Sequence, residues 1–438
     1  MLETLRNAFR IKDIRKKLIF TFLMLIVIRF GSQLPVPGVN RDYFSNWFAS
    51  QQANGAFNFF SAFTGGSFER MSIFALSITP YITSSIIMQL LTIAIPKLEE
   101  MQRDGEDGRK KIREITRYVT VGLALFESTA MTIGFGRSGL LEHANFLSGL
   151  TVVVALTAGS AFLMWIGERI TENGVGNGIS IVLMINILSR VPQDIAVLFE
   201  QFVQGKTIAR GALAGLIILA VIVLTVVLVI ILNDATRKIP VQYAKKMQGR
   251  RMVGGQSTYI PLKVNTAGVI PVIFASSLFS IPQMIVSFTG KAASGVGATV
   301  LGMLNQNNWF NFRQPVYSVG LVLYIVLIIF FAYFYTSITF NPIEVADNMK
   351  KQGGFIPGIR PGRPTTDFLN KILGYIVFIG AVGLTIVVLV PIFTNGVFGA
   401  NVSFGGTSII IIVSVILETI KQIESQMVVR NYRGFLGE

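Results

Sequence analysis

Long apolar segments alternate with short charged ones along the whole chain. A helix rises about 1.5 Å per residue, so about 20 apolar residues cross a hydrocarbon core of about 30 Å. The stretch 372–417 carries no charge over 46 residues and counts as two helices, broken between Pro391 and Gly406. The predicted spans are roughly 18–36, 71–95, 116–136, 147–168, 177–191, 211–232, 265–288, 314–336, 371–394 and 405–424. The pattern predicts an all-α polytopic membrane protein with ten transmembrane helices.

The segment from Phe57 to Leu91 departs from this simple alternation. Its first part, 57–70, is too short to span a bilayer and holds the Gly65-Gly66 break and the charged pair Glu69-Arg70. The next part, 71–95, is free of charge but rich in serine and threonine. A helix that faces only lipid would not carry so many polar groups, so this span is expected to face other helices or water. We predict a half-inserted element that leads into a polar spanning helix.

The composition agrees with a membrane protein and excludes several kinds of site. The chain is 52% hydrophobic and 14% charged, with a mean hydropathy of +0.60. It has no cysteine, which excludes disulfides, thiolate metal sites and cysteine nucleophiles. A histidine metal cluster is excluded because His143 is the one histidine, and it is expected to be solvated in an outer loop.

The basic residues are distributed very unevenly between the two sides of the predicted membrane topology. The loops on the side of the termini hold 29 Lys and Arg residues and the opposite loops hold 7. This bias predicts that both termini are cytoplasmic, and it accounts for most of the net charge of +15. Loop 233–263 has seven basic residues and one acid, Asp234. A nucleic-acid enzyme is a poor interpretation, whereas a docking surface for ribosomal RNA or a soluble acidic partner stays open.

The two ends of the chain lie outside the predicted spans. Residues 1–17 fit an interfacial amphipathic helix, with Leu2, Leu5 and Phe9 on one side, although a disordered basic tail fits them nearly as well. The apolar run after them is followed by Leu34-Pro35-Val36-Pro37 instead of a cleavage site, so it is not a cleavable signal. Residues 425–438 are predicted to form a cytoplasmic tail.

Two glycine motifs and two charges inside spans were weighed as functional signals. Gly205-Lys206-Thr207 is rejected as a phosphate-binding loop because Glu200 stands where its first glycine belongs. The run 174–178 is interpreted as a tight cytoplasmic turn. Glu127 lies within a span, where such residues are usually functional or face protein, and Arg29 can snorkel to the outer surface. No chain of acids crosses the membrane, which weakens an ion-coupled transporter.

Several motifs together resemble one family. The segments are Phe74–Gln89 (FALSITPYITSSIIMQ), Trp165–Ser180 (WIGERITENGVGNGIS), Tyr243–Arg251 (YAKKMQGRR), Gln256–Asn265 (QSTYIPLKVN), Gly268–Ser277 (GVIPVIFASS), Asn341–Lys351 (NPIEVADNMKK) and Pro357–Gly362 (PGIRPG). They resemble the SecY family of protein-translocation channels, in order, from about residue 10 to 435. Ser77 stands where the family pattern usually has glycine, and Glu127 stands where a neutral residue is expected.

The resemblance implies a fold, a function and a set of partners. The fold would have two pseudosymmetric five-helix halves, 18–191 and 192–424, with a short plug helix at 57–70 and cytoplasmic loops at 233–263 and 337–370. The chain would be a passive protein-conducting channel in the bacterial plasma membrane, without a catalytic site, cofactor or small-molecule substrate. Its partners would be the SecE and SecG subunits, the SecA ATPase, the ribosome, preproteins with signal sequences, and the lipid bilayer.

The resemblance also assigns site residues in four groups. The pore ring would be formed by Ile78, Ile82, Leu183, Ile187, Ile273 and Ile411, and the plug would include Phe57, Phe60, Ser61, Ala62, Gly65, Gly66, Ser67 and Arg70. The lateral gate, between the second and seventh helices, would have Thr79, Thr83, Gln89, Glu127, Ser276 and Ser277. The motor or ribosome would dock on Lys245, Lys246, Arg250, Arg251 and Arg360. The spacing of Ile78 and Ile82, and of Leu183 and Ile187, places each pair on one helix face. Each of these apolar residues alone is more often plain core.

Two other classes of protein were compared with the channel. A secondary transporter would have a midplane site in broken helices and coupling acids, and Glu127 with the proline-interrupted helices is the case for it. A purely structural scaffold is disfavoured by the half-inserted segment. Co-purification with two small membrane subunits, or binding of a motor ATPase but no solute, would discriminate among these classes.

Overall fold

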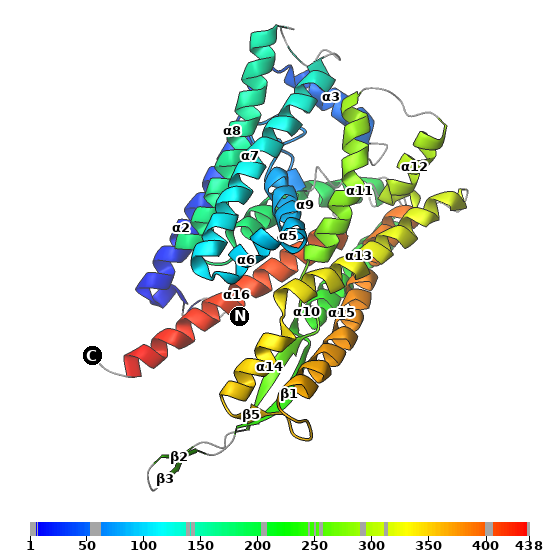
Figure 1. The fold of residues 1–438 in the computed structure, drawn as a ribbon. Coiled ribbons are helices and arrows are strands. Elements are labelled where there is room, and N and C mark those ends of the chain that lie inside the picture. Colours follow the sequence, from blue (N-terminus) through cyan, green and yellow to red (C-terminus); the bar gives the residue numbers. More distant parts are fainter. Residues whose placement is uncertain are drawn as a thin grey trace.

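The structure is a computed structural model of the 438-residue chain. It describes residues 6, 8–52, 63–136, 141, 145–202, 208–243, 246–248, 251–253, 257–289, 295–310, 314–398 and 406–435. The described chain is predominantly helical, and its helices gather in two groups (Figure 1).

The first group comes from the N-terminal part of the chain. Its helices are α2 (Lys12–Gly31), α3 (Arg41–Gln52), α5 (Thr79–Ala94), α6 (Pro96–Arg103), α7 (Glu106–Gly136), α8 (Phe146–Asn173) and α9 (Gly178–Phe202). Within this group α7 packs against α5 and α8, and α8 also contacts α2 and α9.

The second group follows in the chain and is completed by the last helix. It contains α10 (Ile208–Asp234), α11 (Ile270–Thr289), α12 (Val296–Leu304), α13 (Ser318–Thr339), α14 (Pro342–Lys351), α15 (Arg363–Phe398) and α16 (Gly406–Phe435), with short 3₁₀ turns η1 (Gln306–Asn308) and η2 (Pro315–Tyr317) before α13. Helix α16 contacts α9 of the first group as well as α10 and α15, and α7 contacts α11. These contacts join the two groups.

The described helices account for part of the predicted set of spans. By length and composition, six of the described helices can cross a membrane, and a seventh span results if the bent pair α5 and α6, which meet at 105°, counts as one. Helix α11 is apolar over the shorter stretch Ile270–Gln283. The number of ten spans therefore stays a prediction.

The predicted continuous helix over 71–95 is wrong in its first third. The described residues from 65 to 78 form turns, and the helix begins only at Thr79. Pro80 occupies the first turn of α5, where a missing N–H costs nothing. Before it, Gly65, Gly66 and Ser77 have φ values of 63°, 80° and 53°, which a right-handed helix does not allow.

Other predicted boundaries differ because helices continue through them. Helix α9 runs to Phe202 with Pro192 inside it, so the predicted division at residue 191 falls within a helix. A proline inside a helix removes one hydrogen bond, which neighbouring groups in a membrane protein can replace. Helix α16 continues beyond residue 424 to Phe435, and α2 already begins at Lys12.

The two loops 233–263 and 337–370 contribute to a small sheet that was not predicted from the sequence. Strand β1 (Thr236–Tyr243) pairs antiparallel with β4 (Ser257–Lys263) and, at its end, with β5 (Gly354–Phe355). Strands β2 (Lys246–Gln248) and β3 (Arg251–Val253) form a hairpin that projects from the body (Figure 1). The inner face of the sheet packs on α14 and α15 through a cluster whose buried members are Ile239, Val241, Leu262, Ala346, Met349, Ile356, Leu369 and Ile376. The sheet therefore ties the two loops together.

Replacing Gly159 on α8 with leucine should destabilise the protein. A Cβ at this position would lie 2.0 Å from the backbone oxygen of Ile73, so α8 and the turn that contains Ile73 would have to move away from each other. We expect a lower thermal unfolding midpoint in detergent. The matched control is Gly122→Leu on α7, where a Cβ meets nothing within 4 Å. Equal midpoints for the two variants would contradict the close packing of α8 on this segment.

Candidate functional site

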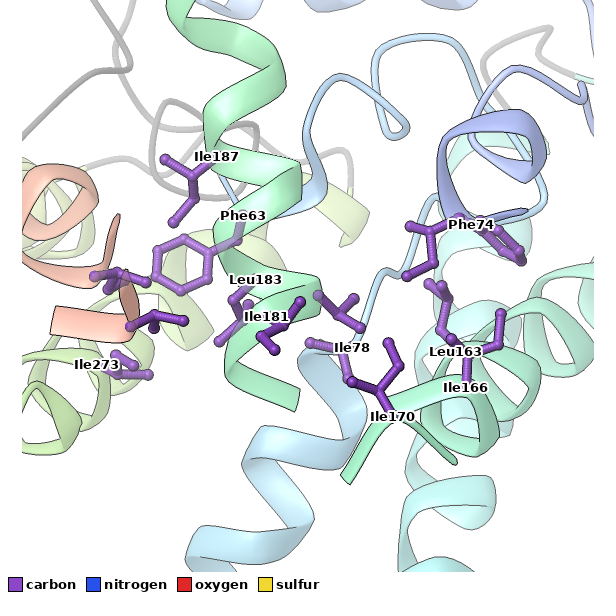
Figure 2. Packing of buried hydrophobic residues seen from close by; sticks show 14 residues of the cluster. Phe63, Phe74, Ile78, Leu163, Ile166, Ile170, Ile181, Leu183, Ile187 and Ile273 are labelled. Carbon is purple, nitrogen blue, oxygen red and sulfur yellow. The ribbon is translucent and has the colours of Figure 1, made fainter. Parts of the chain in front are cut away.

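The six residues of the predicted pore ring lie in one apolar cluster. Ile78, Leu183, Ile187, Ile273 and Ile411 are buried members of it, and Ile82 packs against it. Ile78 immediately precedes α5, and its carbonyl accepts the N–H of Ile82 at 3.1 Å. The others come from α9, α11 and α16, so four elements and both groups of helices contribute (Figure 2).

Phe63 belongs to the same cluster, and it lies within the predicted plug segment 57–70 without being among the plug residues named individually. It is 3% exposed, and its ring lies beside α9 at the level between Ile187 and Leu183 (Figure 2). Phe63 comes from the half-inserted segment, so this segment contacts the ring directly. A large apolar residue next to the small residues 64–67 was the signal that could have identified it.

The described part of the predicted plug packs on α9. A Cβ at Gly65 would lie 2.7 Å from the backbone oxygen of Asn186, so only glycine fits there. Ser67 is buried, and Gly66, like Gly65 before it, has a positive φ. The Arg70 guanidinium donates a hydrogen bond to the Gln33 side chain. Phe57, Phe60, Ser61 and Ala62 lie outside the described residues.

Three residues of the ring help to line a cavity of about 490 Å³. Ile82, Leu183 and Ile273 line it together with the charged residues Arg113, Arg117, Glu168 and Glu172. The Arg117 Nε donates to Glu168 Oε1 at 2.7 Å, which connects α7 to α8 across the wall. The cavity lining therefore combines charged side chains with aliphatic side chains of the ring.

The structure brings only some of the predicted gate residues together. Gln89 lines the cavity, and Thr79 and Thr83 are half-buried on α5. Ser276 is buried, and its hydroxyl pairs with the Tyr324 hydroxyl of α13 at 2.8 Å. The role of Ser276 in a lateral gate stays a prediction.

Apolar side chains of α5 and α11 belong to two common clusters. Ile82 packs in the ring cluster with Ile273, and Ile86 packs against a cluster that includes Phe274. Ser277 is half-buried on α11. Glu127 is half-buried on α7, which contacts both α5 and α11, and its Oε2 is buried without a hydrogen-bond partner among the described residues.

The predicted docking residues lie on the two loops 233–263 and 337–370. Arg360 is exposed at the end of the turn between β5 and α15. Lys246 and Arg251 belong to the β2–β3 hairpin, whereas Lys245 and Arg250 lie outside the described residues. The sheet connects the base of the hairpin with the turn that carries Arg360.

The glycine-rich run 174–178 forms the predicted tight turn between α8 and α9. Gly176 has a φ of 84°, and the N–H of Gly178 donates to Thr171 Oγ1 at 2.9 Å. A Cβ at Gly178 would lie 1.8 Å from the Gly167 oxygen, so the two helices meet closely here. His143 and the rejected motif at 205–207 lie outside the described residues.

Comparisons with known proteins give one consistent family. The family model described as SecY matches residues 72–420. The protein translocase subunit SecY of Streptomyces scabiei is 47% identical over 452 residues, and the match covers 100% of both chains. The same subunit of Bacillus subtilis (strain 168) is 44% identical over 448 residues, again with 100% of both chains covered.

Solved structures show the same fold. A SecY protein studied for the plug domain that stabilises its closed state has a TM-score of 0.62 at 18% identity, covering 94% of this chain and 92% of that chain. Sec61 in the canine ribosome-channel complex from the endoplasmic reticulum has a TM-score of 0.57 at 16% identity, covering 94% and 93%.

Proposed function

The chain belongs to the SecY family, and from this premise we propose that it is the central pore-forming subunit of a bacterial protein translocase. It passes unfolded secretory polypeptides across the plasma membrane and releases signal or transmembrane segments sideways into the bilayer. SecA or the translating ribosome supplies the driving force, and the chain itself carries no catalytic site.

The observation that carries the proposal is the cavity that charged side chains and three residues of the aliphatic ring line together. Charged groups such as Arg113 and Glu172 keep its wall hydrated, which suits an unfolded polypeptide with its many backbone polar groups. The ring of branched aliphatic side chains offers no fixed hydrogen bonds to a passing chain, and it excludes water by dewetting when the chain is absent. A path that admits many sequences but not ions requires this combination.

Two neighbouring features support a channel that opens in two directions. Segment 57–70 acts as the plug, and Phe63 from it already packs in the ring cluster. The lateral gate lies between α5 and α11, which belong to different groups of helices. Ile82 of α5 and Ile273 of α11 belong to the same apolar cluster, so a hydrophobic signal segment can take the place of apolar side chains there.

The partners and the location follow from the relatives and from the charge distribution. The similar bacterial proteins are named translocase subunits, and a structural neighbour comes from a ribosome-channel complex. We infer that SecE and SecG complete the channel, that both termini are cytoplasmic, and that preproteins with signal sequences are the substrates. The basic loops 233–263 and 337–370 receive SecA or the ribosome.

Reconstitution into vesicles tests the proposed function. The chain, purified with SecE and SecG, is inserted into liposomes of bacterial lipid, and SecA, ATP and a precursor are added. We expect import of the precursor, measured as protection from added protease. Omitting ATP, or deleting the signal sequence of the precursor, is the matched control. A protected fraction equal to that of empty liposomes would contradict the proposal.

A further inference from the structure

We propose that Asn186 and Arg190 of α9 form a polar lock, together with Ser77 and Glu69, that holds the segment 63–77 against the aliphatic ring and determines how readily the channel opens. The proposal rests on the proposed function, because it assigns a role in opening to residues beside the ring. The lock differs from the ring in chemistry, because its contacts are hydrogen bonds and an ion pair and not apolar packing.

The first part of the lock is a closed triangle of hydrogen bonds. Asn186 Nδ2 donates to the Phe63 carbonyl at 3.3 Å and to Ser77 Oγ at 3.1 Å, and Ser77 Oγ donates to the same carbonyl at 3.2 Å. Asn186 and Ser77 are 3% and 1% exposed, so these bonds form away from water. One amide side chain thus fixes both ends of the segment on α9.

The backbone of Ser77 shows why its hydroxyl matters. Its φ of 53° lies in the left-handed region, which costs free energy for a residue that has a Cβ. Glycine would adopt this conformation without strain but could neither accept from Asn186 nor donate to Phe63. The free-energy cost of the left-handed backbone at Ser77 is therefore offset by two buried hydrogen bonds of its hydroxyl.

The second part of the lock lies one turn further along α9. Arg190 Nη1 pairs with Glu69 Oε1 at 2.6 Å, and the two side chains are 7% and 21% exposed. Residues four apart share a helix face, so Arg190 and Asn186 face the segment together. Between them, Ser189 Oγ lies 3.4 Å from the Gly65 carbonyl, and Gly65 contacts the backbone of α9.

The position of the lock connects it to the ring at both of its ends. Ser77 directly precedes Ile78, and Asn186 directly precedes Ile187. Apolar packing is non-directional and tolerates sliding, whereas a hydrogen bond weakens steeply when its atoms separate or tilt. The segment cannot leave the ring without breaking the lock. The released groups can then bind water, so the net cost is moderate and the opening is reversible.

The test uses the reconstituted chain with SecE and SecG and two readouts. The variants are Asn186→Ala, Ser77→Gly and Glu69→Gln. We expect each to raise the resting ion leak of the vesicles several-fold, and to increase SecA-driven import of a precursor whose signal sequence has been weakened. The control is Asp234→Asn, which removes the exposed ion pair with Lys421 outside the lock.

Ser77→Gly separates a lock from a merely structural role. A structural role predicts only a changed thermal unfolding midpoint, because the substitution relieves backbone strain and removes two buried hydrogen bonds, with no change in leak. The lock predicts a higher leak whichever way the midpoint moves. The swapped variant Glu69→Arg with Arg190→Glu should leak less than either single substitution, since it restores an ion pair.

Covalent closure provides the converse experiment. The chain has no cysteine, so Glu69→Cys with Arg190→Cys adds two thiols that a short cleavable bifunctional thiol reagent can join. Joining them should stop import, and cleaving the linker should restore it. If wild type imports precursor while all lock variants keep wild-type leak and the joined variant still imports, the lock is wrong. If wild type itself does not import, the proposed function fails instead.

Discussion

Replacing Arg360 with glutamate should abolish SecA-driven import of a precursor while membrane insertion, topology and SecE binding stay intact. The reason lies in how the turn presents this side chain. Gly358 and Gly362, on either side of it, have φ values of 84° and 104°, so the turn requires glycine at both positions. Ile356 is buried in the cluster under the sheet, and Ile359 packs against that cluster. Thr365 Oγ1 donates to the Arg360 carbonyl at 2.9 Å.

An exposed arginine on a turn with a restricted backbone fits a docking role better than a role in topology alone. The guanidinium fork binds carboxylate or phosphate through two parallel hydrogen bonds, which a lysine ammonium cannot reproduce. Arg360→Lys should therefore import clearly more slowly than wild type, although the charge is unchanged. The expected loss for Arg360→Glu is larger, because it adds repulsion to the missing contact.

The neighbouring arginine offers a matched control for charge. Arg363 is exposed three residues further on, at the first residue of α15, outside the frame formed by the two glycines. Arg363→Glu should keep most of the import rate, measured as protease-protected precursor against time. Normal import by both Arg360→Glu and Arg360→Lys would show that the loop only determines topology.

Replacing Ile82 and Ile187 together with glycine should produce a large resting ion leak. The two side chains come from different helices and contribute to the same cluster, so their removal takes apolar bulk from two sides of the constriction. A widened, less apolar constriction stays hydrated, and hydrated paths conduct ions. The measurement is the conductance of planar bilayers, or dye-reported ion flux in vesicles, with no precursor present.

The double glycine variant needs a control for general destabilisation. Each glycine costs a helix about 1 kcal/mol, and a cavity left by a buried isoleucine costs more. Leu90→Gly with Leu188→Gly removes two exposed leucines from the same two helices and carries the same helix cost. If this control leaks as much as the ring variant, the leak reports unfolding and not the constriction.

The six predicted ring residues meet in one apolar cluster, as motif placement and helical spacing led us to expect, and their role as a pore ring stays a prediction. Leu183 and Ile187 are one turn apart on α9, and both are buried in the same cluster. The turns before Thr79 were not predictable from hydrophobicity, since a buried turn and a buried helix have the same apolar composition. The positive φ of Ser77 was not predictable either, because serine is not a residue type that indicates this backbone conformation.

The partners of polar side chains inside spans were the least predictable part. Thr92, Thr116 and Thr132 each donate to the backbone carbonyl four residues earlier, at 2.7, 2.8 and 2.7 Å. A threonine satisfied within its own helix says nothing about which neighbour it faces. Ser276 shows the consequence, because its partner on α13 was determined by packing between helices distant in sequence.

The ring draws its side chains from both groups of helices, and this couples two movements that could have been independent. Ile78, Ile82, Leu183 and Ile187 belong to the first group, whereas Ile273 and Ile411 belong to the second. When the groups part to let a hydrophobic segment escape into lipid, the same displacement enlarges the aperture across the membrane. The segment that leaves must then itself fill the aperture during its exit. The ion permeability of the channel at that moment therefore depends on the diameter of the translocating segment as well as on the channel.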